Sequence, residues 1–287
     1  KSYKKIKALK NLSLTIPKGS VFGILGPNGS GKTTMMSIVL DILKADTGEY
    51  SWFGLPNSHE ERKRIGALLE TPNFYHYLSA QKNLEIAAAI KGRGKNDILA
   101  ALEKVNLAHR KDSKFSTYSL GMKQRLAIAS CLLGNPDLLV FDEPTNGLDP
   151  EGIAEIRTLI LRLAKEGKTI IMASHLLDEV EKVCSHVIII RKGEKLYSGS
   201  VDEISASKGL FELSSETQNN KLQALLEEHQ SIGSVKVQGE VFIAYLTAEM
   251  KASEMNAYLL ENGVSASHLV KRKPSLEQQF LDLTNNQ

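Results

Sequence analysis

Three glycines, a lysine and two threonines stand together in GPNGSGKTT, residues 26–34, between the apolar run VFGIL and the stretch MMSIVLDIL. Glycine accepts positive φ and leaves no Cβ in the way, so the backbone N–H groups of such a segment can turn inward around an anion. The spacing Gly26-x-x-x-x-Gly31-Lys32-Thr33 fits the phosphate-loop pattern at every fixed position. The segment therefore predicts a site for the phosphates of a nucleoside triphosphate.

In this pattern the backbone amides and the start of the following helix hold the phosphates, the lysine reaches the β- and γ-phosphate oxygens, and the threonine hydroxyl binds Mg²⁺. A glycine-rich turn that only joins a strand to a helix is the alternative, but the strand and helix contexts that the pattern requires are both present. The residues predicted to contact the nucleotide here are Gly26, Pro27, Asn28, Gly29, Ser30, Gly31, Lys32, Thr33 and Thr34.

Two acids, Asp142 and Glu143, end the hydrophobic run in LLVFDEP, residues 138–144. One carboxylate at such a place can hold Mg²⁺, usually through water, and the other can polarise an attacking water. A strand that ends in two acids could also be a solvated turn. The phosphate loop earlier in the chain favours the catalytic interpretation.

The elements that must position these groups follow from the hydrophobic pattern. Strand-like runs such as VFGILG, DLLVFDEP, TIIMASH and HVIIIRKG alternate with helical patterns over residues 1–199, which predicts a largely parallel sheet flanked by helices. Between about residues 80 and 133 the strand signals stop, and QKNLEIAAAIKG, NDILAALEKVNLA and MKQRLAIASCLL predict three helices. We expect an α/β nucleotide-binding domain over 1–199 with a helical insertion.

A second pattern begins after residue 199. GLFELSS, NKLQALLEEHQ, the hairpin SVKVQGEVFIAYLT, SEMNAYLLENG and HLVKRK give the order βαββαβ, which predicts a small α+β domain of ferredoxin-like arrangement over 200–287. SLEQQFLDLTN, near the end, has the pattern of a final helix. This part shows no catalytic cluster, so regulation, subunit contact and dimer support all stay open.

Composition narrows the class of protein. The 287 residues are 42% hydrophobic and 24% charged with a formal net charge of +3, which gives no strong push toward nucleic acid or anionic membrane. Two cysteines without metal-ligand spacing suggest reduced thiols in a cytosolic protein. No apolar run approaches the roughly 18 residues of a membrane span. The chain opens on Lys1, and we expect that an N-terminal strand precedes it.

YSLGMKQRLAIA, residues 118–129, resembles the signature segment of ATP-binding cassette (ABC) ATPases. It is followed, as in that family, by LLVFDEP, by the loop NGLDP and by a histidine in ASH, and the resemblance covers residues 1–200. The family has a P-loop NTPase core, so the resemblance implies ATP and Mg²⁺ as ligands. It implies that Lys32 and Thr33 bind the γ-phosphate and Mg²⁺, that Asp142 holds the metal shell, and that Glu143 is the general base.

Further roles are implied by the same resemblance. His175 would contact the γ-phosphate and the attacking water, and Tyr3 would stack on adenine. Ser119 and Gly121 would contact the γ-phosphate bound by another subunit, because this helix N-terminus would face away from its own phosphate loop. A head-to-tail dimer with two ATPs at the interface follows, with Asp149 at the same interface.

Two positions depart from the family pattern. Leu120 replaces the first of two adjacent glycines, and Glu70 stands where most members carry glutamine. A carboxylate can still bind Mg²⁺ or water, but it cannot donate the amide hydrogen bond, so Glu70 is a candidate for both catalysis and metal binding. Together the departures resemble the branch with the ATPases of bacitracin-type and lantibiotic-immunity exporters.

NFYHYLS, residues 73–79, carries four ring-bearing residues after Glu70. These rings could be local core, or they could form an exposed groove that receives a helix of a membrane subunit.

The leading interpretation is an ATP-hydrolysing subunit that dimerises on ATP at the cytoplasmic face of the cell membrane. It would drive a separate permease that exports a peptide antibiotic or a similar amphiphile. A soluble ABC ATPase acting on DNA or ribosomes is the first alternative, although such proteins typically have two fused cassettes or a long coiled coil. An importer ATPase is the second. No nucleic-acid partner is expected.

Overall fold

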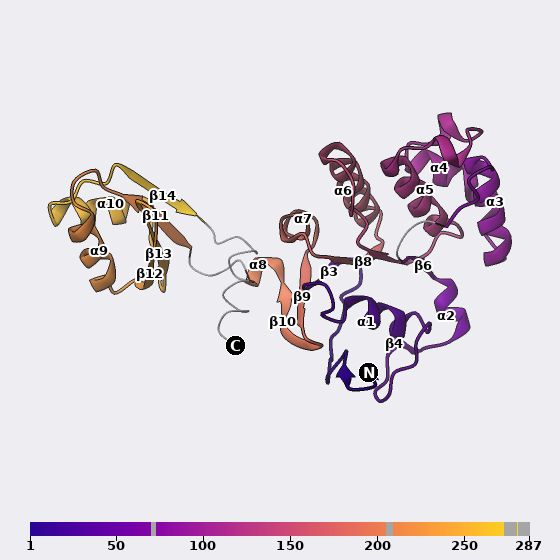
Figure 1. Cartoon of the computed structure of the whole chain (residues 1–287), viewed down its shortest axis with the longest axis horizontal. Helices are drawn as coiled ribbons and strands as arrows, with labels where there is room; N and C mark the ends of the chain where they lie inside the picture. Colours follow the sequence, from indigo (N-terminus) through magenta and orange to yellow (C-terminus); the bar gives the residue numbers. More distant parts are fainter. Residues whose placement is uncertain (70–72, 205–208, 273–279, 281–287) are drawn as a thin grey trace. The chain divides into compact units, whose positions relative to one another are not determined.

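The computed structural model describes residues 1–69, 73–204, 209–272 and 280 (Figure 1). Glu70 lies outside the described residues, and so does the predicted final helix apart from residue 280. The chain divides into two compact units, Lys1–Gly199 and Ser200–Gln287. Each unit has its own hydrophobic core, and each is described by itself.

A six-stranded sheet forms the centre of the first unit. In sheet order its strands are β10 (Glu194–Ser200), β9 (His186–Arg191), β3 (Val21–Leu25), β8 (Thr169–Ser174), β7 (Leu138–Asp142) and β6 (Ile65–Leu68). The strands from β9 to β6 pair in parallel, and β3, β7 and β8 are buried along their whole length, as expected for a sheet covered on both faces. Parallel strands end at one edge, so the segments that follow β3, β7 and β8 meet there.

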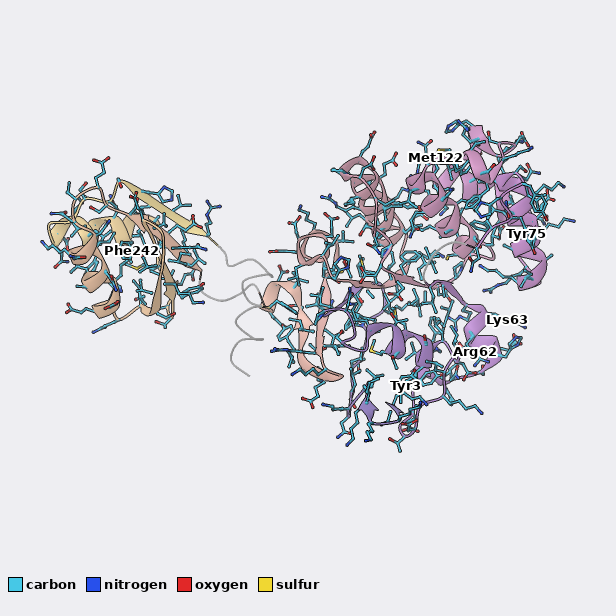
Figure 2. All side chains as sticks on the ribbon, viewed as in Figure 1. Tyr3, Arg62, Lys63, Tyr75, Met122 and Phe242 are labelled. Atoms are coloured by element: carbon cyan, nitrogen blue, oxygen red, sulfur yellow. The ribbon has the colours of Figure 1, made fainter. Side chains whose placement is uncertain are left out.

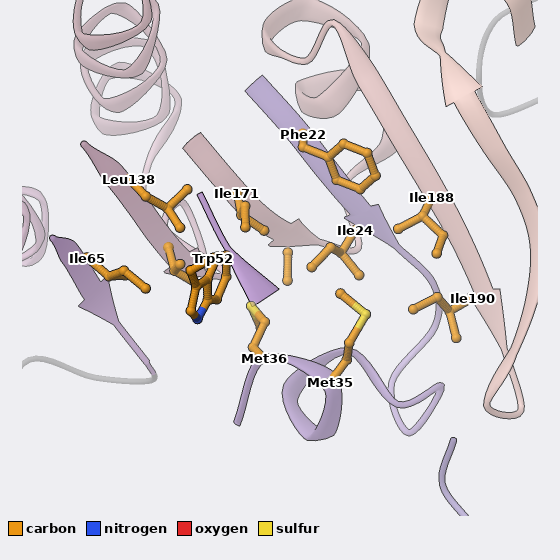
Figure 3. Close-up of a cluster of buried hydrophobic side chains, with 12 residues drawn as sticks. Phe22, Ile24, Met35, Met36, Trp52, Ile65, Leu138, Ile171, Ile188 and Ile190 are labelled. Atoms are coloured by element: carbon orange, nitrogen blue, oxygen red, sulfur yellow. The ribbon is translucent and has the colours of Figure 1, made fainter. Parts of the chain in front are cut away.

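Helices cover both faces of this sheet. Figure 1 shows α6 and α7 on one face and α1 on the other. Between α1 and the sheet lies the cluster drawn in Figure 3, in which Met35 and Met36 pack against strand residues such as Ile24 and Ile188. The indole Nε1–H of Trp52 donates to the carbonyl oxygen of Val39 at 3.0 Å and so holds the end of α1. The phosphate-loop segment is therefore attached to a rigid helix and a rigid sheet.

Helices and four short strands complete the described part of this unit. The helices are α1 (Lys32–Val39), α2 (His59–Lys63), α3 (Ala80–Lys91), α4 (Ile98–Lys104), α5 (Leu120–Leu132), α6 (Pro150–Lys165) and α7 (Leu177–Val183), with 3₁₀ turns at Lys95–Asp97, Ala108–Arg110 and Phe115–Thr117. The short strands are β1 (Ser2–Tyr3), β2 (Ile6–Lys7), β4 (Ser51–Trp52) and β5 (Leu55–Pro56).

Helices α3, α4 and α5 form the predicted helical insertion. Serine side chains begin two of them: the Ser79 hydroxyl accepts the backbone N–H of Lys82, and the Ser119 hydroxyl accepts that of Met122. Gly92 ends α3 with a left-handed backbone, φ +64°, which glycine adopts without strain.

The second unit has a four-stranded antiparallel sheet in the order β12-β13-β11-β14, on which helices α9 and α10 pack. Its elements are α8 (Val201–Ile204), β11 (Leu210–Ser214), α9 (Asn219–Glu228), β12 (Ile232–Gln238), β13 (Val241–Leu246), α10 (Ala252–Glu261) and β14 (His268–Arg272). Leu222 and Leu226 of α9 and Leu259 of α10 share one cluster with Phe211 and Phe242, so both helices cover the same face. The predicted fold class is confirmed: a P-loop NTPase core with a helical insertion, and a ferredoxin-like α+β part.

Candidate nucleotide-binding site

The loop between β3 and α1 has the backbone of an anion cradle. Gly26, Gly29 and Gly31 all have positive φ, at +157°, +76° and +112°. A Cβ on Gly26 would lie 2.3 Å from the carbonyl oxygen of Ile190, and one on Gly31 would lie 2.6 Å from that of Ala8. Glycine is therefore required for close approach as well as for conformation.

Lys32 and Thr33 begin α1 at the base of this loop. The Lys32 side chain is buried, and its ammonium donates to the carbonyl oxygens of Gly26 at 2.7 Å and Pro27 at 3.4 Å. The Thr33 hydroxyl donates to Asp142 Oδ2 at 3.0 Å, which joins α1 to the end of β7. A buried cation and a hydroxyl–carboxylate pair thus lie at the same sheet edge.

Glu143 lies between a lysine and a histidine. Its Oε1 is 3.6 Å from Lys32 Nζ, and its Oε2 is 2.8 Å from His175 Nδ1, just beyond β8. Its backbone is left-handed with φ +49°, although it is not glycine, and its N–H donates to the carbonyl oxygen of Ala173 at 3.1 Å. Such a conformation costs about 1–3 kcal/mol, and it recurs where a side chain must be held in one place.

Asp149 and Ser119 both cap helices. Asp149 Oδ1 accepts the N–H of Gly152 at 2.9 Å at the start of α6, and the Ser119 hydroxyl caps α5. A Cβ on Gly121 would lie 3.9 Å from Gly152 Cα, so the starts of α5 and α6 are close neighbours. The structure therefore brings Ser119, Gly121 and Asp149 into one group.

A cavity of about 430 Å³ lies over the phosphate loop. Its lining residues are Ala8, Asn28, Gly29, Ser30, Gly31, Lys32, Thr33, Thr34, Leu120, Gln124, Asp142, Glu143 and Asn146. The residues predicted for phosphate and Mg²⁺ share this cavity with the candidate base. This arrangement is expected for a bound nucleoside triphosphate next to a group that can polarise water.

The side chains at the start of α5 point in two directions. Leu120 and Gln124 line the cavity over the phosphate loop of their own chain, whereas Ser119 and Gly121, which are predicted to contact another subunit's ATP, do not. The reason is helical geometry, since neighbouring residues point in different directions and residues four apart share a face. Sequence reasoning missed Gln124, Asn146 and Ala8, and the i, i+4 spacing from Leu120 is the signal that could have found Gln124.

Tyr3 does not line this cavity. Its ring is largely exposed in β1, where the ammonium of Lys1 lies 5.7 Å from the ring centroid. The contact of Tyr3 with adenine therefore stays a prediction from the sequence.

The segment 73–79 is divided between core and surface. Phe74 and His76 each make an edge-on contact with the buried ring of Phe115, at centroid distances of 5.3 and 5.5 Å. Tyr75, labelled in Figure 2, is 51% exposed, and Tyr77 is 69% exposed. Phe74 is thus half-buried against Phe115, His76 and both tyrosines are exposed, and contact with a membrane subunit stays a prediction.

Cys131 and Cys184 take no part in the site. Both are buried and free of disulfides. Burial raises the pKa of the Cys131 thiol to about 11, and it raises the pKa of the Cys184 thiol as well. Both side chains are therefore protonated, unreactive core residues at neutral pH.

Comparison with known proteins identifies relatives of the whole chain. Residues 9–146 match the family described as ABC transporter. The bacitracin transport ATP-binding protein BcrA of Bacillus licheniformis is 38% identical over 288 residues, covering 99% of this chain and 94% of that protein. The lantibiotic transport ATP-binding protein SrtF of Streptococcus pyogenes is 40% identical over 218 residues, covering 74% of this chain and 95% of that protein.

Solved structures of ATP-binding proteins are also similar to this chain. cbiO1 from Clostridium perfringens, part of the ABC transporter complex cbiONQ, is 32% identical with a TM-score of 0.64, covering 70% of this chain and 85% of that chain. The ATP-binding cassette MJ0796, in a dimeric post-hydrolysis state bound to ADP and Pi, is 28% identical with a TM-score of 0.61, covering 70% and 94%.

These similarities confirm the predicted family and branch, and they do not favour the two alternatives, an ATPase acting on DNA or ribosomes and an importer ATPase. The chain therefore belongs to the ABC transporter family, as an ATP-binding subunit that hydrolyses ATP.

Proposed function

We propose that the chain drives a separate membrane permease that exports a peptide antibiotic or a similar amphiphile. The observation that carries this proposal is the similarity over nearly the whole chain to a bacitracin transport protein, together with one to a lantibiotic transport protein. None of the helices in the described ranges is long and apolar enough to cross a membrane. In this proposal the chain works at the cytoplasmic face of the cell membrane.

The site supports a hydrolysis mechanism in which each side chain has one role. Lys32 turns from the carbonyl groups of its own loop to the β- and γ-phosphate oxygens, a charge-assisted contact. Glu143 takes the proton of the attacking water, and His175, 2.8 Å from it, holds that carboxylate in place and contacts the γ-phosphate. Tyr3 stays the candidate contact for the adenine on the sequence alone.

Thr33 and Asp142 fit a magnesium ion. A hydroxyl and a carboxylate oxygen 3.0 Å apart are hard oxygen donors, and Mg²⁺ in such sites is bound by one or two carboxylates plus substrate phosphates. When bound, the ion neutralises charge on the β- and γ-phosphates. We include Glu70 among its candidate ligands on the sequence alone.

The dimer proposal concerns Ser119, Gly121 and Asp149. Their grouping at the starts of α5 and α6, with Ser119 and Gly121 outside the cavity of their own loop, fits contact with ATP held by a second copy. The N-terminus of α5 offers free amides and a positive dipole end to that phosphate. Lys1–Gly199 would be the ATPase domain and Ser200–Gln287 an accessory domain.

Tyr75 and Tyr77 are the proposed contact with the permease. The side chain of Asn83, buried in α3, shapes their segment: Oδ1 accepts the N–H of Tyr75 at 2.8 Å, and Nδ2 donates to the carbonyl oxygens of Tyr75 at 3.1 Å and Ser79 at 3.0 Å. Two exposed tyrosines on a held segment form a pre-organised apolar surface, which is typical of an interaction site.

Binding to native membranes tests this function. Membrane vesicles from the source cell, washed free of peripheral protein, should retain the purified chain, and protein-free vesicles of the same lipids should not. Tyr77→Ala should weaken retention with basal ATPase nearly unchanged, because the ring is exposed and outside the cavity. Ile90→Ala, on an exposed apolar residue of α3, is the matched control. Retention of Tyr77→Ala equal to wild type, or a parallel fall in melting temperature and ATPase, contradicts the docking role.

A further inference from the structure

Helix α7 follows His175 directly and is held from two sides. It begins at Leu177, and its Val180 packs over Gly23 of β3, where a Cβ would lie 2.8 Å from Val180 Cγ1. On the other side, Glu179 Oε1 lies 3.3 Å from Arg157 Nη2 of α6, and the Glu179 side chain is 10% exposed. The position of α7 therefore depends on the apolar packing of its buried Val180 and Val183 and on the ion pair with α6.

Glu179 is buried, so its negative charge depends on a nearby cation. A buried carboxylate is tolerated when a cation compensates it, and removal of one partner leaves an uncompensated charge. By contrast, the pair between Asp178 and Lys182, also on α7, is exposed. Arg157 is thus the cation that keeps the first turn of α7 against α6.

The contact is made by one side of each group. Arg157 Nε and Glu179 Oε2 are both buried and have no hydrogen-bond partner. A guanidinium and a carboxylate can form two parallel hydrogen bonds, so these two atoms are complementary to one another. Because the ion pair joins a residue of α6 to a residue of α7, its separation depends on the placement of α7.

We propose that Arg157 is a positioning residue for His175. Through Glu179 it fixes the first turn of α7, and this sets the approach of His175 Nδ1 to Glu143 Oε2. Because Asp149 caps the same helix α6, the placement of His175 follows the placement of Asp149. The inference rests on the proposed roles of His175 and Glu143 in hydrolysis.

Steady-state ATPase kinetics of the full chain test the inference. Arg157→Ala should lower kcat roughly 10- to 100-fold, because a shift of about 1 Å in a catalytic group has effects of this size. KM for ATP should stay within about twofold, since the phosphate loop is untouched. Arg157→Lys keeps the charge but not the planar fork, so its kcat should lie between those of Arg157→Ala and wild type.

Two controls separate positioning from loss of stability. Lys182→Ala breaks the exposed ion pair of α7 and should leave kcat unchanged. Leu163→Ala opens the core under α6 and should lower the melting temperature while kcat, measured well below that temperature, is retained. An Arg157→Ala protein that is folded and turns over at the wild-type rate overturns the inference, and so does a Leu163→Ala protein with the same fall in kcat.

A double variant gives the sharpest result. If Arg157 acts through His175, the variant Arg157→Ala/His175→Ala should be no slower than His175→Ala alone. If the two substitutions lowered kcat by factors that multiply, Arg157 would act on a group other than His175. A normal rate for His175→Ala itself would contradict the proposed role of the histidine, whereas a slow His175→Ala beside a normal Arg157→Ala contradicts the positioning inference alone.

Discussion

The two units of the chain bury different kinds of side chain. Among the described residues, the buried polar and charged side chains belong to the first unit, with Ser215 as the exception. In the second unit, charges pair on the surface, as Glu212 does with Arg272 at 2.7 Å on the helix-free face of the sheet. In the first, Lys32, Asp142 and Glu179 are each less than one-tenth exposed. Buried charges are costly, so their concentration marks where the chemistry lies.

The backbone differs in the same way. Within the described ranges, the non-glycine residues with positive φ all lie in the first unit, and Glu143 is one of them. In the second unit, strand β13 alternates regularly between buried and half-exposed residues. The comparison teaches that a regular fold needs no strained residue, while a site that places a base beside phosphates does.

Lys32→Ala should give the largest effect. It removes the one buried cation over the phosphate loop, and charge-assisted hydrogen bonds contribute about 1.5–3 kcal/mol, so ATP affinity should fall at least roughly tenfold. Isothermal titration calorimetry with ATP and Mg²⁺ measures this change in ATP affinity. Lys10→Ala, at an exposed ion pair with Glu194, should bind normally. Equal ATP affinities for Lys32→Ala and Lys10→Ala would contradict the claim that the buried charge contributes more to ATP binding than the exposed one.

A mixture of two inactive variants should recover part of the activity. Gly121→Asp damages the start of α5 and Lys32→Ala the phosphate loop, so a mixed dimer keeps one site with both halves intact if the halves come from different chains. ATPase activity is measured over a range of mixing ratios. Activity above that of either variant alone is expected; no recovery at any ratio would contradict a site shared between copies, or show that both sites must act together.

Phe242→Ala should have the smallest effect on ATP. The ring is buried in the second unit (Figure 2), and its loss should cost about 3–5 kcal/mol there. Basal ATPase should remain near wild type.

In the same Phe242→Ala variant, the thiols of Cys131 and Cys184 in the first unit should stay slow to react with an alkylating reagent, because burial raises the pKa of both. Fast alkylation or loss of ATPase would mean that the two units do not unfold independently.

Much of this architecture follows from the sequence. The glycine spacing predicts the phosphate loop, the serines before α3 and α5 fit their starts, and the alternation around Gly239 gives the hairpin β12–β13. The position of Gln124 in the lining of the cavity could not be predicted, and neither could the ion pair between Arg157 and Glu179. Both depend on how separate elements pack against one another. The outward direction of Tyr75 and Tyr77 was equally open, since a loop has no period that fixes which side chains are buried.

The central claim is that ATP is hydrolysed at the edge of the first sheet with Glu143 as the base. Turnover and ATP affinity of Glu143→Gln, measured on the same preparation, test it most directly. The substitution keeps the shape but removes the proton acceptor, so affinity should be retained while turnover falls on the order of 10²–10⁴-fold. Near-normal turnover by a folded Glu143→Gln protein would contradict the claim and move the base to another residue.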